Sequence, residues 1–148
     1  MNGYYKDKNG TQSWWVNGKL HREDGPAFIG VDGSQEWWVN NKLHREDGPA
    51  VISTNGYESW HLNGIRHRED GPAVILADGY QEWWVNGERH REDGPAVIGV
   101  DGYQAWWVNG NHVTDEVNEW FTLYNLTYET MDEEERMIFG FHIRSLVK

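Results

Sequence analysis

The residues best suited to chemistry stand together in one heptapeptide, HREDGPA, which occurs four times. An imidazole beside an arginine and two carboxylates offers the groups that acid–base catalysis or a metal site would use. Each copy begins 23 residues after the previous one, and the copies span His21–Ala27, His44–Ala50, His67–Ala73 and His90–Ala96. General acid–base catalysis needs one constellation whose pKa values are separated by its own surroundings. Four similar copies therefore argue against an enzyme.

A metal ion shared between copies is disfavoured by their spacing. If each unit adds a two-stranded hairpin, successive histidines lie about 10 Å apart, whereas ligands approach zinc to about 2.0–2.2 Å. We therefore predict no catalytic residue, no metal site and no cofactor, and assign the heptapeptide to a structural corner. Its arginine pairs with a carboxylate and its histidine hydrogen-bonds backbone at the Gly-Pro bend. The predicted corner residues are His21, Arg22, Asp24, His44, Arg45, Asp47, His67, Arg68, Asp70, His90, Arg91 and Asp93.

The elements that must position these corners are β-strands. Short runs rich in aromatic and β-branched residues alternate with Asn-Gly and Asp-Gly pairs, such as Asp32-Gly33 and Asn86-Gly87. We expect these pairs to form type I′ hairpin turns, because both dipeptides tolerate positive φ angles. Residues 1–112 are therefore predicted to be mostly β, as an array of about five 23-residue hairpin repeats that begins with a half unit. The array would be an elongated single-layer or curved sheet.

Strand alternation divides the tandem tryptophans into two series. The first series is assigned to the core, together with the Ala and Ile residues of the apolar strands, and comprises Trp14, Trp37, Trp60, Trp83 and Trp106. The second series is a candidate outer aromatic row for binding, which tyrosines extend: Trp15, Trp38, His61, Trp84, Trp107, Tyr57, Tyr80 and Tyr103. The alternative is that these outer rings only pack on arginine stems and neighbouring strands. The divergence of the third unit at His61 and Ile65 fits either a local binding site or drift.

The remaining residues, 113–148, have a helical pattern. Thr114 and the two acids after it predict one helix start, and Thr130–Glu133 fits a capping box at the start of a second helix. The second helix carries apolar residues that need a partner surface, namely Met137, Ile138, Phe141 and Ile143. We expect a cap over the open edge of the last hairpin, because uncovered sheet edges invite aggregation. The alternative is a dimerisation element.

Composition limits the classes of partner. The formal charge is −11, from 13 basic and 24 acidic residues. This balance disfavours non-specific nucleic-acid binding and anionic membrane surfaces. The chain contains no cysteine, and neither a secretory signal nor a membrane-spanning apolar run is evident. We therefore predict a cytoplasmic protein of the producing or infected cell.

The segment WWVNGKLHREDGPA at Trp14–Ala27, with its copies, resembles the MORN repeat family. The resemblance covers residues 2 to about 111 and rests on the period, the aromatic-x-x-Asn-Gly block and the acidic-Gly that follows. The proline after that glycine and the uniform HRED depart from MORN units. The most similar units are degenerate ones of bacterial antitoxin-like, phage and large-virus proteins. The resemblance implies stacked β-hairpins and a scaffold that binds proteins, sometimes lipid, without shared catalytic residues.

These observations predict a non-enzymatic binding protein whose partner is a protein. The resemblance and the acidity suggest a phage or bacterial inhibitor that sequesters a host toxin or defence protein. One alternative is a small-ligand binder in which exposed Trp and Tyr rings stack on sugars or nucleotides. Another is a virion or structural homo-oligomer, joined through the C-terminal helices.

Overall fold

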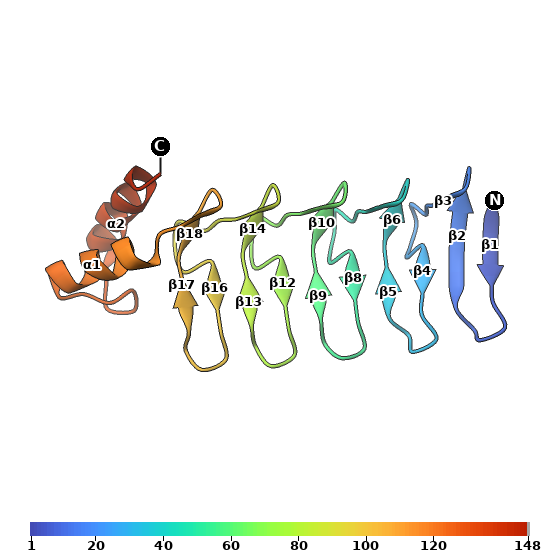
Figure 1. Ribbon diagram of the computed structural model, residues 1–148, viewed down its shortest axis with the longest axis horizontal. Helices are drawn as coiled ribbons and strands as arrows, with labels where there is room; N and C mark the ends of the chain where they lie inside the picture. Colours follow the sequence, from blue (N-terminus) through green and yellow to red (C-terminus); the bar gives the residue numbers. More distant parts are fainter. Residues whose placement is uncertain (148) are drawn as a thin grey trace.

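The chain forms one long, open antiparallel sheet followed by two helices (Figure 1). This arrangement is seen in a computed structural model that describes residues 1–147. Ten strands of the large sheet pair in sequence order, and they are β1 (Gly3–Lys6), β2 (Gln12–Val16), β4 (Phe28–Ile29), β5 (Gln35–Glu36), β8 (Val51–Ile52), β9 (Glu58–Ser59), β12 (Val74–Ile75), β13 (Gln81–Glu82), β16 (Val97–Ile98) and β17 (Gln104–Ala105). The prediction of a mostly β hairpin array with a helical C-terminus is confirmed.

A second, smaller hairpin stands at the same end of each unit. Strand β3 (Lys19–Leu20) pairs with β2, and the later units form separate hairpins: β6 (Trp38–Val39) with β7 (Lys42–Leu43), β10 (His61–Leu62) with β11 (Ile65–Arg66), β14 (Trp84–Val85) with β15 (Glu88–Arg89), and β18 (Trp107–Val108) with β19 (Asn111–His112). Both central residues of their turns have positive φ, for example 52° at Asn86 and 81° at Gly87. Type I′ turns are therefore confirmed here.

The turns at the other end of each unit, away from the small hairpins, are of another kind, and the type I′ prediction is wrong there. At Asp32-Gly33 only the glycine has positive φ, at 88°. The Gly33 N–H donates to the Gly30 carbonyl, and the Gly30 N–H donates to the Ser34 carbonyl. This is a type I turn followed by a left-handed glycine, the usual three-residue hairpin loop. The Asp32 carboxylate accepts the Ser34 N–H, which favours this turn locally.

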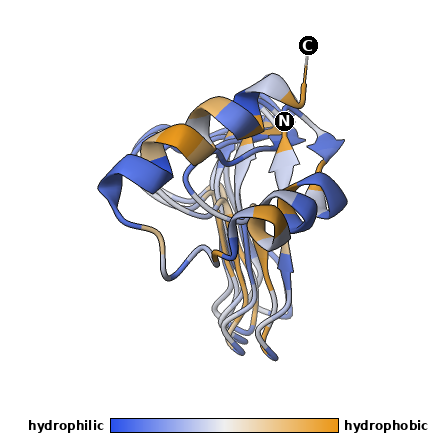
Figure 2. Ribbon diagram, turned by 90° about the vertical axis from the view of Figure 1, so that its left-hand side faces the viewer, coloured by the Kyte–Doolittle hydropathy of each residue, from blue (hydrophilic) through white to orange (hydrophobic). Residues whose placement is uncertain are grey.

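The units stack in a single layer, so each strand pair is buried mainly by its neighbours. Viewed along the array, the units lie one behind another (Figure 2). The alanines of the apolar strands are fully buried, whereas the isoleucines beside them are half-buried. Ala50, for example, is bonded on both sides: its N–H donates to the Ser59 carbonyl, and its own carbonyl accepts the Trp37 N–H.

Two helices close the C-terminal end of the array. Helix α1 spans Thr114–Tyr124 and α2 spans Glu133–Ser145. The predicted start of α1 at Thr114 is confirmed. The capping box of α2 lies two residues later than predicted: Asp132 accepts the Glu135 N–H, and the Glu135 side chain accepts the Asp132 N–H. Thr130 instead bonds Thr127 in the preceding turn.

An apolar core joins the helices to the last unit. Its buried members are Trp106, Val108, Val113, Val117, Trp120, Met131, Phe139 and Ile143. Of the four apolar residues expected to need a partner surface, only Ile143 is buried. Met137, Ile138 and Phe141 are exposed, because Phe139 and Ile143 define the packed face of α2. Lys148, the end of the predicted cap, lies outside the described residues. Within residues 1–147, no helix has the length and apolar character needed to span a membrane.

Candidate functional site

The arginine of each corner lies between its own loop and a tryptophan. In the second copy, Arg45 Nε donates to Asp47 Oδ1 at 2.9 Å and Nη1 donates to the Pro49 carbonyl at 3.2 Å. The guanidinium carbon lies 3.9 Å from the ring centroid of Trp37. The other three copies repeat these contacts, with cation–π distances of 4.0–4.2 Å. Arginine is suited to this place because one planar group both stacks and donates.

The glycine of the heptapeptide leaves room for that guanidinium group. A Cβ added at Gly71 would lie 2.9 Å from Arg68 Cζ, and one at Gly94 would lie 2.5 Å from Arg91 Cζ. The arginine in turn acts on the aspartate: its hydrogen bond and then its charge hold the pKa of Asp47 below its usual value. The pKa values of Asp24 and Asp70 are lowered for the same reasons.

The histidine of each corner connects its unit to the next one. His44 Nδ1 accepts the backbone N–H of Asn63, in the following Asn-Gly turn, at 3.0 Å. The other copies make the same bond at 3.0–3.2 Å. The predicted bond to the backbone of its own Gly-Pro bend is replaced by this contact between units. Because Nδ1 accepts, Nε2 carries the ring proton and faces Glu46, 3.7 Å away.

The first tryptophan series is not a core, except at its last member. Trp106 is 1% exposed, whereas Trp14, Trp37, Trp60 and Trp83 are only half-buried. The prediction is wrong for these four because a single-layer sheet has no opposing layer to cover them. A corner arginine covers each one instead. The fifth unit lacks the heptapeptide, and Phe121, Tyr128 and Phe139 pack edge-on against Trp106 in its place.

The second series lies on the other face but does not form a bare aromatic ribbon. All of its tryptophans are half-buried, and His61 is buried. Long side chains from the small hairpins lie between the rings: Trp84 has Arg66 at 5.2 Å and Arg89 at 5.0 Å, measured from guanidinium carbon to ring centroid. Arg89 is also 5.2 Å from Trp107. At Trp84 and Trp107, the outer rings therefore pack on arginine side chains, as the alternative prediction had it.

The tyrosines of the predicted row differ from one another. Tyr57 is half-buried, Tyr103 is 61% exposed, and the Tyr80 hydroxyl donates to Glu82 Oε1 at 2.6 Å. Burial first, and then that contact with the Glu82 carboxylate, raises the pKa of Tyr80 to about 12. Only Tyr103 presents most of its ring to solvent.

Glu82 is a buried polar centre that sequence reasoning missed. Its carboxylate accepts from Tyr80, from Trp84 Nε1 at 2.7 Å and from Arg89 Nη2 at 2.8 Å. Burial alone would raise the pKa of Glu82, but these hydrogen bonds outweigh burial and lower it. The alternation Tyr-x-Glu-x-Trp signals that three of these groups share a face. The approach of Arg89 depends on the register across the Asn-Gly turn.

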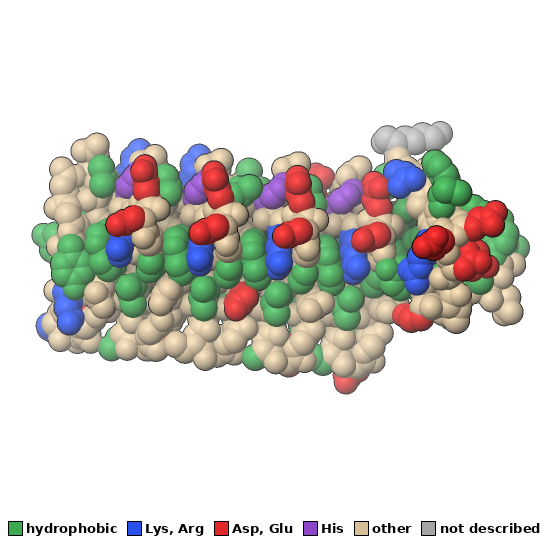
Figure 3. Space-filling view, turned by 180° about the vertical axis from the view of Figure 1, so that it is seen from behind, with side chains coloured by type: hydrophobic (Ala, Val, Ile, Leu, Met, Phe, Trp, Pro, Cys, Tyr) green, Lys and Arg blue, Asp and Glu red, His purple; other side chains and the backbone are tan. Residues whose placement is uncertain are grey.

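The corners line up along one face beside a band of apolar side chains (Figure 3). Between successive corners lie two similar open grooves. One, of about 690 Å³, has Trp60 and Leu62 in its lining together with Pro49 and Glu69. The next, of about 680 Å³, has Trp83, Val85, Pro72 and Glu92 at the equivalent positions. At these two steps the face therefore offers similar apolar and acidic groups.

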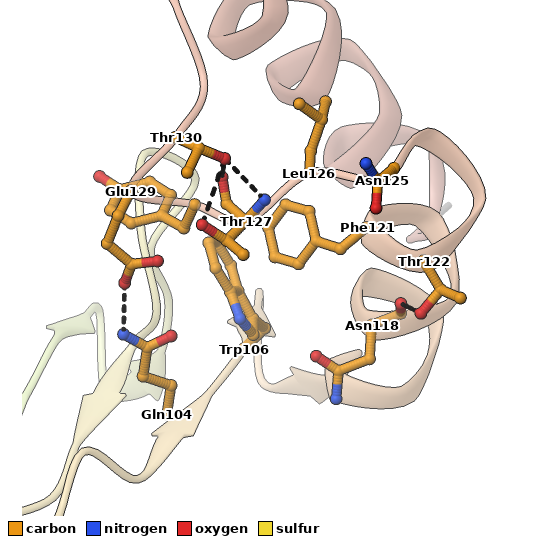
Figure 4. A pocket seen from close by; sticks show the side chains of 11 residues that line it. Gln104, Trp106, Asn118, Phe121, Thr122, Asn125, Leu126, Thr127, Glu129 and Thr130 are labelled. Carbon is orange, nitrogen blue, oxygen red and sulfur yellow. Dashed lines mark hydrogen bonds between the residues drawn. The ribbon is translucent and has the colours of Figure 1, made fainter.

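A different cavity, of about 680 Å³, lies where the last unit meets the helices (Figure 4). Trp106 and Phe121 contribute apolar walls, and Gln104, Asn118 and Glu129 contribute polar groups. Gln104 Nε2 donates to Glu129 Oε1 at 3.1 Å across the opening. The cavity can offer hydrogen bonds to a polar ligand, but the face of Trp106 is covered.

Among residues 1–147, no group of three or more His, Cys, Asp or Glu side chains is placed to hold a metal ion. No protein-family model matches the sequence. No curated protein matches it either.

Proposed function

We propose that this chain is a MORN-like, non-enzymatic binding protein that presents a periodic surface to a protein partner. The observation that supports this most is the recurrence of the same corner and groove, with the same contacts, at successive steps of one face. A repeat array of this kind binds extended surfaces because each unit adds an equal contact. The acidity and the family resemblance favour an inhibitor that sequesters a host toxin or defence protein in the cytoplasm.

The corner chemistry favours binding over catalysis. Each corner arginine is held by its aspartate and a proline carbonyl, and each histidine uses Nδ1 for a backbone N–H. These groups are already engaged in supporting the sheet. The arginine and the histidine also make the same contacts in all four copies, so they do not give any one copy the distinct surroundings that a catalytic group needs.

A set of unit deletions tests the proposal. Removing residues 28–50, 51–73 or 74–96 excises one 23-residue period and joins an alanine to the same kind of apolar strand each time. A partner captured by the full chain is then titrated against each deletion by surface plasmon resonance. We expect the three deletions to weaken binding to a similar extent. A single deletion that abolishes binding while the other two leave it unchanged would contradict a periodic surface.

The cavity in Figure 4 favours a second candidate, a small polar ligand such as a sugar. Its polar walls come from Gln104, Asn118 and Glu129. Binding there would change the fluorescence of Trp106, so titration of the wild type and of Trp106→Phe with a sugar and nucleotide panel tests it. A ligand signal that is equal in both proteins would place the ligand elsewhere.

A further inference from the structure

The glutamate is the member of the heptapeptide that the fold uses least. The side chains of Glu23, Glu46 and Glu69 are 82–84% exposed, and the histidine Nε2 of the same copy lies 3.5–3.7 Å from the carboxylate. A glutamate nevertheless stands at this place in all four copies. The exposed place after each Asn-Gly or Asn-Asn turn of the small hairpins carries a lysine, an isoleucine, a glutamate or an asparagine. The repeated glutamate is therefore a candidate for contact with something outside the array.

The fourth corner already holds a cationic group, supplied by the chain itself. Arg144 of α2 places Nη1 3.0 Å from Glu92 Oε2, and the Glu92 side chain is only 35% exposed. Next to this pair, the Tyr128 hydroxyl donates to the Asp93 carbonyl. The cap therefore occupies the fourth corner: an arginine pairs with the glutamate, and a tyrosine hydroxyl bonds the loop beside it. The first three corners present the same glutamate without such an occupant.

The charge of the corner face also fits a basic partner. Each copy carries one arginine against one glutamate and one aspartate, so with a neutral histidine its net charge is +1 − 2 = −1. The aspartate is neutralised by its own arginine, at 2.8–2.9 Å in every copy. The glutamate carries the charge that remains. The whole chain, at −11, attracts cationic segments over longer distances.

The spacing of the corners suggests the backbone conformation of a peptide that could bind along them. Each unit adds two strands to the sheet, so the corners recur about every 9.6 Å. A polyproline II segment advances about 9.3 Å in three residues. The groove linings also suit it, because proline rings and arginine stems pack well on Trp60 with Leu62 or on Trp83 with Val85.

We propose that the corner face is the docking track for an extended segment of a partner protein that carries an arginine at every third residue. The arginines bind Glu23, Glu46 and Glu69, and the intervening residues lie in the grooves. This inference rests on the proposed function and specifies the chemistry of the partner.

The test uses the full chain and an end-capped, fluorescein-labelled peptide of four Arg-Pro-Pro triplets, followed by fluorescence anisotropy. We expect E23Q, E46Q and E69Q together to weaken binding about tenfold, since single exposed ion pairs are weak but three act together. The matched control combines E116Q, E119Q and E134Q. These substitutions replace three exposed glutamates of the helices and remove the same amount of charge. We expect this control to change the affinity less than twofold. A peptide of the same composition with its four arginines adjacent should bind several-fold more weakly.

Three results would overturn the inference: no binding of the triplet peptide, an equal loss in the two triple variants, or equal affinity for the two peptides. The proposed function is judged separately by the unit deletions. If the captured partner binds the E23Q/E46Q/E69Q variant as tightly as wild type yet loses affinity with each deletion, a periodic surface stands and the arginine track does not. If the deletions leave capture unchanged, the proposed function itself fails.

Discussion

The corner arginine is the residue around which each unit is arranged. It donates to an aspartate and a proline carbonyl of its own loop, and it covers a tryptophan that the single-layer sheet leaves open. Its neighbours in the heptapeptide follow from that placement. The glycine gives it space, and the histidine fixes the loop to the next unit. At the scale of single residues, HREDGPA is a packing motif, and its exposed glutamate takes little part in the packing.

A methyl group at Gly71 tests this arrangement. We expect Gly71→Ala to lower the free energy of unfolding by about 1–3 kcal/mol, because the new Cβ would overlap the Arg68 guanidinium group. Chemical denaturation gives the value. In an Arg68→Ala background the same change should cost much less, since the overlapping group is absent. A cost that stays equal in both backgrounds would mean that the loop backbone, and not the arginine, requires glycine.

At the scale of the element, each of the first four units pairs its outer ring with the residue two places before it. Trp38 Nε1 donates to Glu36, and Trp15 Nε1 donates to Ser13 at 2.8 Å. The third unit keeps a serine, Ser59, but has His61 in place of tryptophan. His61 is buried, and its Nδ1 has no hydrogen-bond partner within residues 1–147. The unit tolerates the exchange but leaves one polar atom unsatisfied.

We expect His61→Trp to stabilise the protein by about 1 kcal/mol at neutral pH. The change removes the unpaired Nδ1 of His61 and gives Ser59 an indole N–H donor. Burial first, and then the charge of Arg66, lowers the pKa of His61 from its usual 6.5. Below that pH the unfolded chain binds a proton that the folded state resists, so the wild type loses stability as the pH falls. The advantage of His61→Trp should therefore be larger at pH 5 than at pH 8, as measured by urea denaturation.

The reciprocal variant Trp15→His is the control, because Ser13 is in the same position relative to Trp15 as Ser59 is to His61. It should destabilise the protein, and more so at pH 5. If His61→Trp is destabilising at both pH values, the third unit is shaped for histidine.

At the scale of the whole molecule, the cap replaces the heptapeptide that the fifth unit lacks. Trp106 is covered by Phe121, Tyr128 and Phe139, as an arginine covers the corresponding ring in every earlier unit. Arg144 then joins the cap to the fourth corner through Glu92. The cap thus covers a tryptophan, by edge-on aromatic contacts in place of an arginine, and pairs with a corner carboxylate.

Phe139→Ala should destabilise the cap by roughly 3–5 kcal/mol, because Phe139 is buried among Trp106, Trp120 and Phe121. Each unit contacts mainly its neighbours, so the loss should remain local. Hydrogen exchange followed by mass spectrometry should show faster exchange in 113–147 and in β18–β19, with little change before residue 74. The exposed neighbour Phe141→Ala is the matched control and should change little. Faster exchange along the whole array would indicate one cooperative unit instead.

The sequence by itself determined the period, the strands, the type I′ turns of the small hairpins and the start of the first helix. These features follow from local physics: glycine and asparagine at positive φ, alternation along a strand, and acids at a helix start. The corner residues could be singled out for the same reason, because a repeated motif marks a repeated structural place.

Only the tertiary structure decided which rings are covered, and by what. Trp37 and Trp106 stand in the same sequence block, yet one lies under an arginine and the other under a helical cap. Alternation assigns a side chain to a face of the sheet but not to a depth. The burial of a side chain depends on what covers that face. Here the covering groups come from segments eight or more residues away, from the neighbouring unit and from the two helices.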